Sequence, residues 1–527
     1  MRALEAMSPA QVAGSLQQAL ALHRAGQLEP AAALYRAVLT HFPDHADALH
    51  LSGLIARQQG DLSRAIELMT RAVTADPNHA VAHCNLGVAM HDRGENEAAL
   101  ACYQRALALR PGYAVAWNNS GNALLSLGRV EAALDAYVRA TEFDPTSVQA
   151  WYHCGIAAQR LQRHDDARHA FEQVLSRDAR HAAAWCAMGV GWQRQQQYQL
   201  ALDCYQRASV LDPNYAEALC NHAALLQRLM RDEEAIVLFD RAIALRACDA
   251  RAYLGRARSH QQSGYPAAAI ADLMQARELG ADPEQIAYRL AALGAAAMPQ
   301  RAPPQHVKEL FDQYADHFDR HLQQDLAYDV PALLLAALTP HVSMPIARVL
   351  DLGCGTGLCG PLLRPIVTEL IGVDLSERML AHARQRGIYD ALVTGEAVEY
   401  LRSASNSFGL IVAADVLVYF GDLKPLFEAL SATLTEQGRF AFSVEASDGP
   451  SVQLGPHHRY AHSLALIEQL AAEHRFAVLH QERAYVRREA TAAVAALLIV
   501  LRRLPDVASS TESTRTAMQY AQHRALP

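Results

Sequence analysis

The chain has 527 residues, of which 51% are hydrophobic and 19% charged, a composition typical of well-packed globular proteins. Its formal net charge of −8 argues against general binding to nucleic acids or anionic membranes. The length predicts roughly three to four domains, or fewer if one is a long repeat array.

The first residues, an internal apolar run and the cysteines together indicate the cellular compartment. Residues 1–18 contain no apolar segment of the kind that directs secretion. The apolar run Ala332–Leu338 is too short and too rich in alanine to span a bilayer. The nine cysteines form no C-x-x-C pair and no regular Cys/His spacing, so we predict no metal site. These features predict a cytoplasmic protein without a membrane span.

A 34-residue period runs through the first half of the sequence. Proline or alanine recurs on this grid at Pro43, Pro77, Pro111, Pro145, Ala179, Pro213, Ala247 and Ala281. Within each unit, small residues recur where two helices must touch, at Gly53, Gly87, Gly121, Gly155 and Gly189, then at Ala65, Ala99, Ala133, Ala167, Ala201, Ala235 and Ala269. Bulky residues such as Tyr103 and Phe171 fill the opposing positions. This is the pattern of tetratricopeptide (TPR) helix–turn–helix units, about eight of them over residues 12–281.

Such units cannot bury their apolar faces alone, so they stack into a superhelix with a concave groove. We therefore predict an α-solenoid over residues 1–298. Its last segment, residues 283–298, is expected to form a capping helix. The proline-rich residues 299–304 then predict a locally stiff linker that cannot continue a helix.

Asparagines share one register on the first helices of three units, at Asn85, Asn119 and Asn221. An asparagine ladder in a superhelix interior can bind the backbone of an extended peptide. The repeats resemble those of the O-linked N-acetylglucosamine transferases, whose ladder does this. We predict a protein or peptide partner in the groove. The alternative is that these asparagines are ordinary exposed residues of such helices.

Residues 348–357 (RVLDLGCGTG) join a short apolar strand to a glycine-rich turn. Glycines at alternate positions (Gly353, Gly355, Gly357) supply positive φ and let the backbone approach a ligand closely. The next apolar run ends in Asp374, at the spacing that a nucleotide-binding βαβ unit uses to hold a ribose.

Two cofactor classes compete for this layout. Gly355, Gly357 and Gly360 match the G-x-G-x-x-G pattern of dinucleotide sites, but the loop already opens at Gly353, which breaks the register. Asp351 also places a negative charge where a pyrophosphate would sit. A cationic sulfonium would tolerate or use that charge, which favours S-adenosylmethionine (SAM). A dinucleotide site, or a fold without a cofactor, remains the alternative.

From residue 305 on, apolar runs alternate with helical stretches. Strands are predicted at residues 347–352, 369–374, 391–395, 408–414, 438–444, 476–482 and 497–502. Seven strands with intervening helices predict a doubly wound, Rossmann-like α/β domain over residues 305–503. The last two strands are expected to form an antiparallel hairpin around a short insert. Residues 504–527 predict a disordered tail.

Several pieces of residues 308–503 resemble class I SAM-dependent methyltransferases that carry TPR repeats. The pieces are LFDQYADHFDRHL, VLDLGCGTGL, IGVDLSERML, FGLIVAADVLVYFGDL, FAFSVEAS and LGPHHRYAHS. The first and last of them are the ones that this subfamily shares.

The resemblance implies a set of cofactor-binding residues. Asp351, Gly353, Cys354 and Gly355 belong to the loop around the methionyl part of SAM. The remaining residues are Asp374 at the ribose hydroxyls, Leu375 and Met379 packing on the adenine, Glu396 and Ala397 at the adenine edge, and Asp415 near the amino end. Glu396 has a plain surface carboxylate as its alternative. Tyr314 and Phe318 are candidates for a lid, with core packing as the alternative.

The segment 455–463 follows the predicted fifth strand and supplies candidate catalytic groups. His458, Tyr460 and His462 are candidate bases for an acceptor that must lose a proton, and Arg459 is a candidate anion anchor. The alternative is a loop whose polar groups bind backbone. The fourth strand is followed by no NPPY-like motif, which argues against methylation of amide nitrogens or exocyclic base nitrogens.

Together these features predict a SAM-dependent methyltransferase whose TPR groove recruits a protein or peptide that it methylates. Two alternatives remain open. The chain could be a small-molecule O- or N-methyltransferase docked to a complex through its repeats. It could also be an adaptor whose SAM-binding domain does not catalyse.

Overall fold

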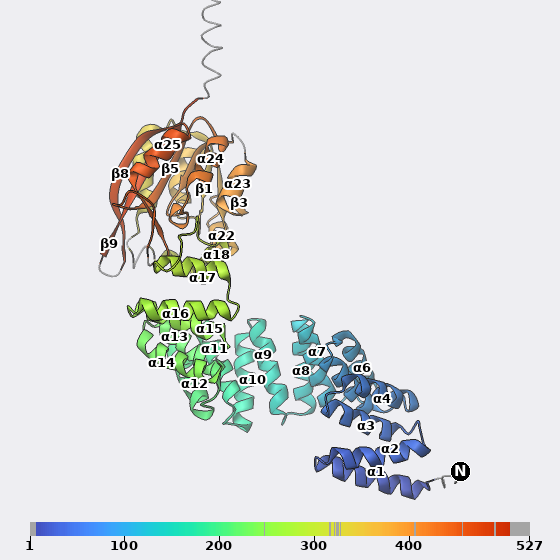
Figure 1. The fold of residues 1–527 in the computed structure, drawn as a ribbon. Coiled ribbons are helices and arrows are strands. Elements are labelled where there is room, and N and C mark those ends of the chain that lie inside the picture. Colours follow the sequence, from blue (N-terminus) through green and yellow to red (C-terminus); the bar gives the residue numbers. More distant parts are fainter. Residues whose placement is uncertain are drawn as a thin grey trace, which may run out of the picture. The chain divides into compact units, whose positions relative to one another are not determined.

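The computed structural model describes residues 7–246, 248–315, 318–320, 322, 326, 328–404, 407–455, 457–489 and 492–505. It divides into two compact units, residues 1–248 and 249–527, which are described separately (Figure 1). Among the described residues, no helix is both long and apolar enough to cross a bilayer. Ala247 of the repeat grid, Pro456 of the candidate loop and residues 506–527 of the predicted tail lie outside the described part.

The first unit is a series of helical hairpins, each packed on the next (Figure 1). The hairpins are α1 (Pro9–Arg24) with α2 (Leu28–His41), α3 (Ala46–Gln58) with α4 (Leu62–Ala75), α5 (Ala80–Asp92) with α6 (Asn96–Leu109), α7 (Ala114–Ser126) with α8 (Val130–Phe143), α9 (Val148–Arg160) with α10 (His164–Arg177), α11 (Ala182–Arg194) with α12 (Tyr198–Leu211), and α13 (Ala216–Arg228) with α14 (Asp232–Leu245). This confirms the predicted solenoid of TPR units.

In five of these hairpins, from α3–α4 to α11–α12, a glycine of the first helix meets a bulky residue of the second. A Cβ atom placed on Gly121 would lie 2.5 Å from Cε1 of Tyr137, and one on Gly87 would lie 2.6 Å from Cε1 of Tyr103. The predicted alanines of the second helices are buried as well, Ala99 and Ala133 completely. The 34-residue period of the sequence therefore arises from helix–helix contacts that recur inside the repeats.

The second unit begins with one more hairpin, α15 (Ala250–Gln262) and α16 (Pro266–Glu278), followed by α17 (Pro283–Ala292). Helix α17 thus covers the first part of the predicted capping segment 283–298. The later helices of the second unit are α18 (Pro304–Tyr314), α19 (Phe318–Arg320), α20 (Val330–Leu338), α21 (Gly360–Leu363), α22 (Glu377–Arg386), α23 (Ala397–Ser403), α24 (Lys424–Thr433) and α25 (Leu464–Glu473). Short 3-10 turns lie at η3 (Thr339–His341), η4 (Arg364–Ile366) and η5 (Leu417–Tyr419).

A mixed sheet forms the centre of this unit (Figure 1). Its strands are β1 (Ile346–Leu352), β2 (Val367–Asp374), β3 (Ala391–Thr394), β4 (Phe408–Ala413), β5 (Leu434–Ala446), β6 (Gln453–Leu454), β7 (Tyr460–His462), β8 (Phe476–Glu489) and β9 (Ala492–Arg503). The order β3-β2-β1-β4-β5 is parallel, and β9 and then β8 continue it antiparallel. This confirms the predicted doubly wound seven-stranded domain, to which β6 and β7 add a short extension beside the end of β5.

Alternate residues of the central strands face opposite sides of the sheet, as the pleat requires. Leu350 and Leu352 pack in one core with α23, α24 and α25, whereas Val349 packs in a second core with α20 and α21. Because both faces are covered, these strands read as continuous apolar runs in the sequence.

The final hairpin is longer than the sequence predicted. Within 483–496, which we expected to form an insert, residues 483–489 continue β8 and residues 492–496 continue β9 instead. Strand β8 pairs only with β9 among the described strands, so it lies at the edge of the sheet. The added part of β8 carries Arg483, Arg487 and the exposed Tyr485. Edge strands often carry such polar residues, so an apolar run in the sequence does not mark them as strands.

Candidate functional site

A cavity lies at the carboxyl ends of the parallel strands, where doubly wound sheets bind ligands. It encloses about 1180 Å³ of empty space, part of it open to solvent at the mouth. Residues at or directly after the ends of four strands line it, namely Gly353–Gly355, Asp374–Leu375, Gly395–Ala397 and Ala414–Val416. The cavity wall is mainly apolar, with a few charged groups, as is usual for small-molecule sites.

The loop after β1 has a backbone that requires glycine. Gly353, Gly355 and Gly357 have φ of 69°, 56° and 86°, which side chains disfavour. A Cβ on Gly353 would also lie 2.4 Å from Cγ2 of Val416, so this glycine lets the loops after β1 and β4 touch. Gly355 instead faces the cavity, and a Cβ there would meet the ring of Phe318 at 3.8 Å. Its missing side chain leaves room for a ligand against the backbone.

Asp374 ends β2 and lines the cavity beside this loop. One carboxylate oxygen accepts a hydrogen bond from the Gly355 N–H at 2.9 Å, and the other accepts from the Ser376 N–H at 2.8 Å. Burial raises the pKa of Asp374, and the backbone hydrogen bonds counteract this rise. A carboxylate has more acceptor positions than these two bonds use, so the oriented group can accept further bonds from a ligand.

Asp351 lies behind the glycine loop and not on the cavity wall. Its side chain is 1% exposed and accepts a hydrogen bond of 2.6 Å from the hydroxyl of Tyr389. Burial raises the pKa of Asp351 to about 7. The predicted contact between this carboxylate and a cofactor stays a prediction, which the placement does not favour. Met379 is likewise fully buried and does not line the cavity.

Three of the residues that the sequence assigned to the adenine, Leu375, Glu396 and Ala397, lie on the cavity wall, and their contact with an adenine stays a prediction. Glu396 is also the N-cap of α23, where Oε2 accepts a 2.9 Å hydrogen bond from the Glu399 N–H. Its Oε1 lies 3.5 Å from Nη1 of Arg301. The carboxylate therefore has structural partners in addition to any ligand.

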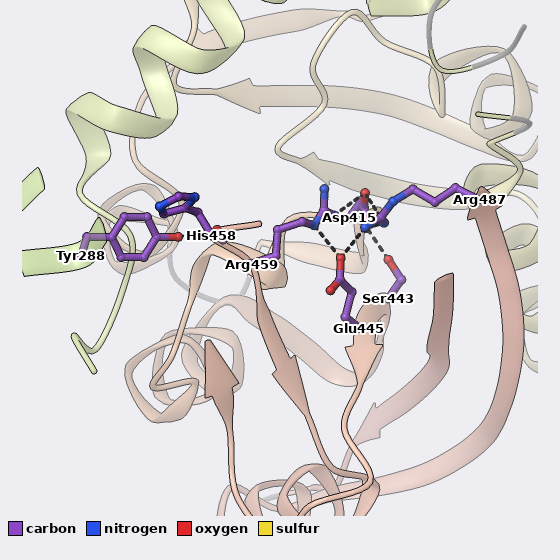
Figure 2. A network of polar contacts seen from close by, with 7 residues as sticks. All are labelled: Tyr288, Asp415, Ser443, Glu445, His458, Arg459 and Arg487. Carbon is purple, nitrogen blue, oxygen red and sulfur yellow. Dashed lines mark hydrogen bonds and ion pairs between the residues drawn. The ribbon is translucent and has the colours of Figure 1, made fainter. Parts of the chain in front are cut away.

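Asp415 follows β4 and belongs to a buried network of two carboxylates and two guanidinium groups (Figure 2). Its carboxylate lies 2.6 Å from Nη2 of Arg459 and 3.3 Å from Nη1 of Arg487. Glu445 on β5 lies 2.6 Å from Nε of Arg459 and also contacts Arg487. Burial would raise the pKa of Asp415, but the two guanidinium groups outweigh it and hold that pKa below its usual range. Asp415 and Arg459 both line the cavity.

The backbone at Asp415 is strained. Its φ of +63° is uncommon for a residue with a side chain. The Asp415 N–H donates a 2.9 Å hydrogen bond to Oγ of Ser443, which helps to hold this conformation (Figure 2). Strain of this kind gathers at functional sites, where it fixes a side chain in place.

Of the described residues 457–463, Arg459 is the one that lines the cavity. The candidate bases His458, Tyr460 and His462 lie elsewhere. The ring of His458 packs near those of Tyr288 and His306, with centroids 5.6 and 6.0 Å away. Tyr460 and His462 are fully buried, and burial lowers the pKa of both His458 and His462 to about 4. Their catalytic roles stay predictions, which this placement does not favour.

The cavity is covered by residues that precede β1. Phe311 on α18, Phe318 on α19 and Leu322 line it, whereas Tyr314 is 43% exposed and lies outside the lining. Of the two residues predicted for a lid, Phe318 therefore lines the cavity and Tyr314 does not.

Four residues around the cavity escaped the sequence analysis, namely Arg301, Tyr389, Glu445 and Arg487. Arg301 lies in a segment that we interpreted as a linker, and Arg487 lies in the stretch that we took for an insert. A charged residue inside a strand-forming stretch was the only available signal for Arg487.

Comparisons with known proteins agree with this architecture. A methyltransferase domain model matches residues 349–438, and tetratricopeptide repeat models match residues 16–80, 148–181 and 182–215. A further TPR repeat model matches residues 89–128 and 121–162.

Curated relatives with methyltransferase names match part of the chain. A malonyl-(acyl-carrier protein) O-methyltransferase of Erwinia pyrifoliae is 31% identical over 188 residues, 33% of this chain and 67% of the relative. Its counterpart in Enterobacter lignolyticus is 31% identical over 144 residues, 27% of this chain and 55% of the relative. The first curated relatives are matched over 24%, 55% and 67% of their lengths.

Among solved structures, a tetratricopeptide repeat protein from Parabacteroides merdae is 20% identical with a TM-score of 0.39. The match covers 46% of this chain and 95% of that one.

Proposed function

Since this chain belongs to the methyltransferase family and carries tetratricopeptide repeats ahead of that domain, we propose that it transfers the methyl group of SAM to an acceptor that the repeats recruit. The proposal has three parts, namely the cofactor, the transfer and the recruitment. Each is supported by different residues.

The hydrogen bond between Gly355 and Asp374 is the observation that carries the cofactor assignment. It brings an open stretch of backbone and a half-buried, oriented carboxylate to one wall of the cavity. The carboxylate is suited to two ribose hydroxyls, because a bond with an ionised acceptor is about twice as strong as a neutral one. The bare face of Gly355 leaves space for the chain that continues from the ribose.

The remaining lining suits the other parts of SAM. Leu375 and Ala397 offer apolar contacts for the adenine, with the Glu396 carboxylate at its edge. Bound SAM supplies a methyl group on a cationic sulfur that is already a good leaving group. The residues of this chain then have to align the acceptor and exclude water, and Phe311 and Phe318 over the cavity serve the second purpose.

The repeats support a protein or peptide as the acceptor. Tetratricopeptide solenoids present concave surfaces that suit chain-like ligands. The curated relatives carry names that describe O-methylation of a group borne by an acyl-carrier protein, which is likewise an acceptor delivered by a protein. Arg459 at the cavity wall is already paired with Asp415 and Glu445, so an acidic acceptor would have to compete with these two carboxylates.

The side chains of the candidate ladder, Asn85, Asn119 and Asn221, contact the preceding repeats. Nδ2 of Asn85 lies 2.8 Å from Nε2 of His50, and Nδ2 of Asn119 and Asn221 lie 3.9 and 3.5 Å from Sγ of Cys84 and Cys186. Each amide is half-buried and reaches the preceding repeat. Peptide binding by these residues remains part of the proposal.

Calorimetry with S-adenosylhomocysteine on the full chain tests the cofactor assignment, and absence of binding at millimolar ligand would overturn it. For the acceptor, the full chain is used to capture proteins from an extract, and the captured set is then incubated with methyl-labelled SAM. Label in a captured protein is expected. Label only in a small-molecule fraction would contradict the protein acceptor, and binding without any label would indicate an adaptor.

The ladder is tested in the same assay. The triple variant N85A/N119A/N221A should capture less of the labelled protein, with Asn214→Ala, an exposed loop asparagine of the same array, as the control. Equal capture by both variants and the wild type would show that these amides act only between repeats.

A further inference from the structure

Residues 300–302 of the linker that follows α17 are bound to residues 419–422, after β4, by backbone hydrogen bonds. The Ala302 N–H donates to the Tyr419 carbonyl at 2.8 Å, and Arg301 forms an antiparallel bridge with Phe420. The N–H groups of Gly421 and Asp422 donate to the carbonyl of Gln300 at 2.8 and 2.7 Å. This segment therefore pairs with the chain around η5 almost like an additional strand.

The same segment forms part of the cavity wall. Arg301, Ala302 and Pro304 line the cavity, and Arg301 reaches the Glu396 carboxylate at 3.5 Å. Tyr419, to which Ala302 is bound, lines the cavity as well. The wall on this side is thus shared between the linker and the loop that follows β4.

A second connection joins α17 to the charge network. The hydroxyl of Tyr288 donates a hydrogen bond of 2.5 Å to the carbonyl of His458, the residue before Arg459 (Figure 2). Tyr288 is fully buried, and its ring lies 6.1 Å from that of Tyr460. The Tyr460 hydroxyl in turn donates to the carbonyl of Pro299 at 2.9 Å. Buried tyrosines thus connect α17, the linker and the loop that carries Arg459.

We infer that the linker, which α17 helps to hold in place, is a wall of the cofactor cavity, so that docking of the linker and binding of the cofactor stabilise each other. This inference rests on the proposed function. A ligand that contacts Arg301 and its neighbours favours the docked linker, and linkage makes the effect reciprocal. Helix α17 packs on α16, and Arg289 of α17 donates to the carbonyl of Leu254 on α15. A partner bound at this last hairpin would therefore change cofactor affinity.

Gly421→Ala is the variant that loosens the linker. A Cβ at this position would lie 2.7 Å from Cε1 of Tyr460 and 2.8 Å from the carbonyl oxygen of Pro299, so the linker and the tyrosine that holds it have to move apart. In calorimetry on the full chain, we expect the Kd for S-adenosylhomocysteine to rise by about 5- to 150-fold, the usual range of coupling between sites. Gly455→Ala is the control, because its nearest contact, the Arg459 carbonyl oxygen, would be at an ordinary 3.5 Å.

Tyr288→Phe tests the same inference without adding an atom. It removes only the hydroxyl that holds the His458 carbonyl, and it should also raise this Kd. Tyr265→Phe makes the same change at a half-exposed tyrosine of the same unit and should leave the Kd unchanged. The Gly421→Ala result and this pair give independent answers, so a folding defect in one variant does not decide the outcome.

Trypsin provides the reciprocal measurement on the full-length wild type. Cleavage between Arg301 and the buried Ala302 requires the linker to leave its site. Saturating S-adenosylhomocysteine should slow this cleavage by about 5- to 150-fold and leave cleavage after the exposed Arg246 unchanged. If the wild type does not bind this ligand, the proposed function fails. If it binds, but the variants bind equally well and the cleavage rate does not change, the inference alone is overturned.

Discussion

The backbone N–H of Gly355 donates a 2.9 Å hydrogen bond to the carboxylate of Asp374, joining the loop after β1 to the end of β2. The bond makes the glycine loop and the carboxylate one rigid wall of the cavity. Because Ser376 holds the other oxygen at 2.8 Å, the side chain has a single orientation before any ligand arrives. Preorganisation of this kind removes part of the entropy cost of binding.

Asp374→Ala should therefore weaken cofactor binding strongly. Losing hydrogen bonds to a charged group costs about 1.5–3 kcal/mol, or about one to two decades in Kd. Calorimetry with S-adenosylhomocysteine measures this loss. Asp448→Ala removes an exposed carboxylate of the same unit and should have no effect. Wild-type affinity in Asp374→Ala would show that this carboxylate does not hold the ribose.

Gly353→Ala should destabilise the second unit through two separable effects. Its φ of +69° strains any side chain, and its Cβ would lie 2.4 Å from Val416. Gly387→Ala has a similar φ of +63° but no atom within 4 Å, so it reports the backbone effect alone. Each strained residue costs about 1–3 kcal/mol, and Gly353→Ala should cost clearly more than Gly387→Ala in urea unfolding. Equal losses of unfolding free energy in the two variants would show that Val416, in the loop after β4, moves aside without cost.

Asp351 should make the stability of the folded chain fall as the pH rises through weakly acidic values. Burial raises its pKa to about 7 in the folded state, against about 3.9 in an unfolded chain. Between these values the folded protein binds one proton more than the unfolded protein, so its stability decreases with increasing pH.

Asp351→Asn keeps an acceptor for the Tyr389 hydroxyl and removes the titration. Urea unfolding between about pH 4 and about pH 7 should show a shallower fall for this variant than for the wild type. Parallel curves would contradict the raised pKa.

Arg487→Met should be strongly destabilising, although methionine fits the space. The side chain of Arg487 is 3% exposed and contacts both Asp415 and Glu445. Removing one partner of a buried ion pair leaves an uncompensated charge and costs about 3–5 kcal/mol. Thermal unfolding measures the loss, and Arg483→Met, at an exposed pair on the same strand, should leave the unfolding temperature unchanged.

At acidic pH, the loss of stability caused by Arg487→Met should become smaller. The two guanidinium groups overcome the effect of burial and lower the pKa of Asp415, so the network stabilises the fold above the unfolded-state pKa of about 3.9 and loses this effect as the pH falls further. The difference between Arg487→Met and wild type should therefore shrink below about pH 4. A constant difference would assign the loss to packing alone.

The repeats and the glycine loop could be predicted because their determinants are local. Gly121 and Tyr137 meet within one helical hairpin, so the contact recurs at each period and is visible in the sequence. The turn after β1 likewise needs positive φ at Gly353 and Gly355, and only glycine adopts it without cost. The carboxylate of Asp374 follows from the geometry of a βαβ unit.

Only the tertiary structure decided how distant segments meet around the cavity. Asp415, Glu445, Arg459 and Arg487 come together because parallel and antiparallel strand pairing places their elements side by side, and no local pattern records such a meeting. The sequence predicted a linker at 299–304, but the docking of residues 300–302 depends on backbone groups of residues 419–422, which have no side-chain signature. Sequence patterns report interactions between neighbours along the chain, whereas contacts made by backbone atoms or across a sheet appear only once the chain has folded.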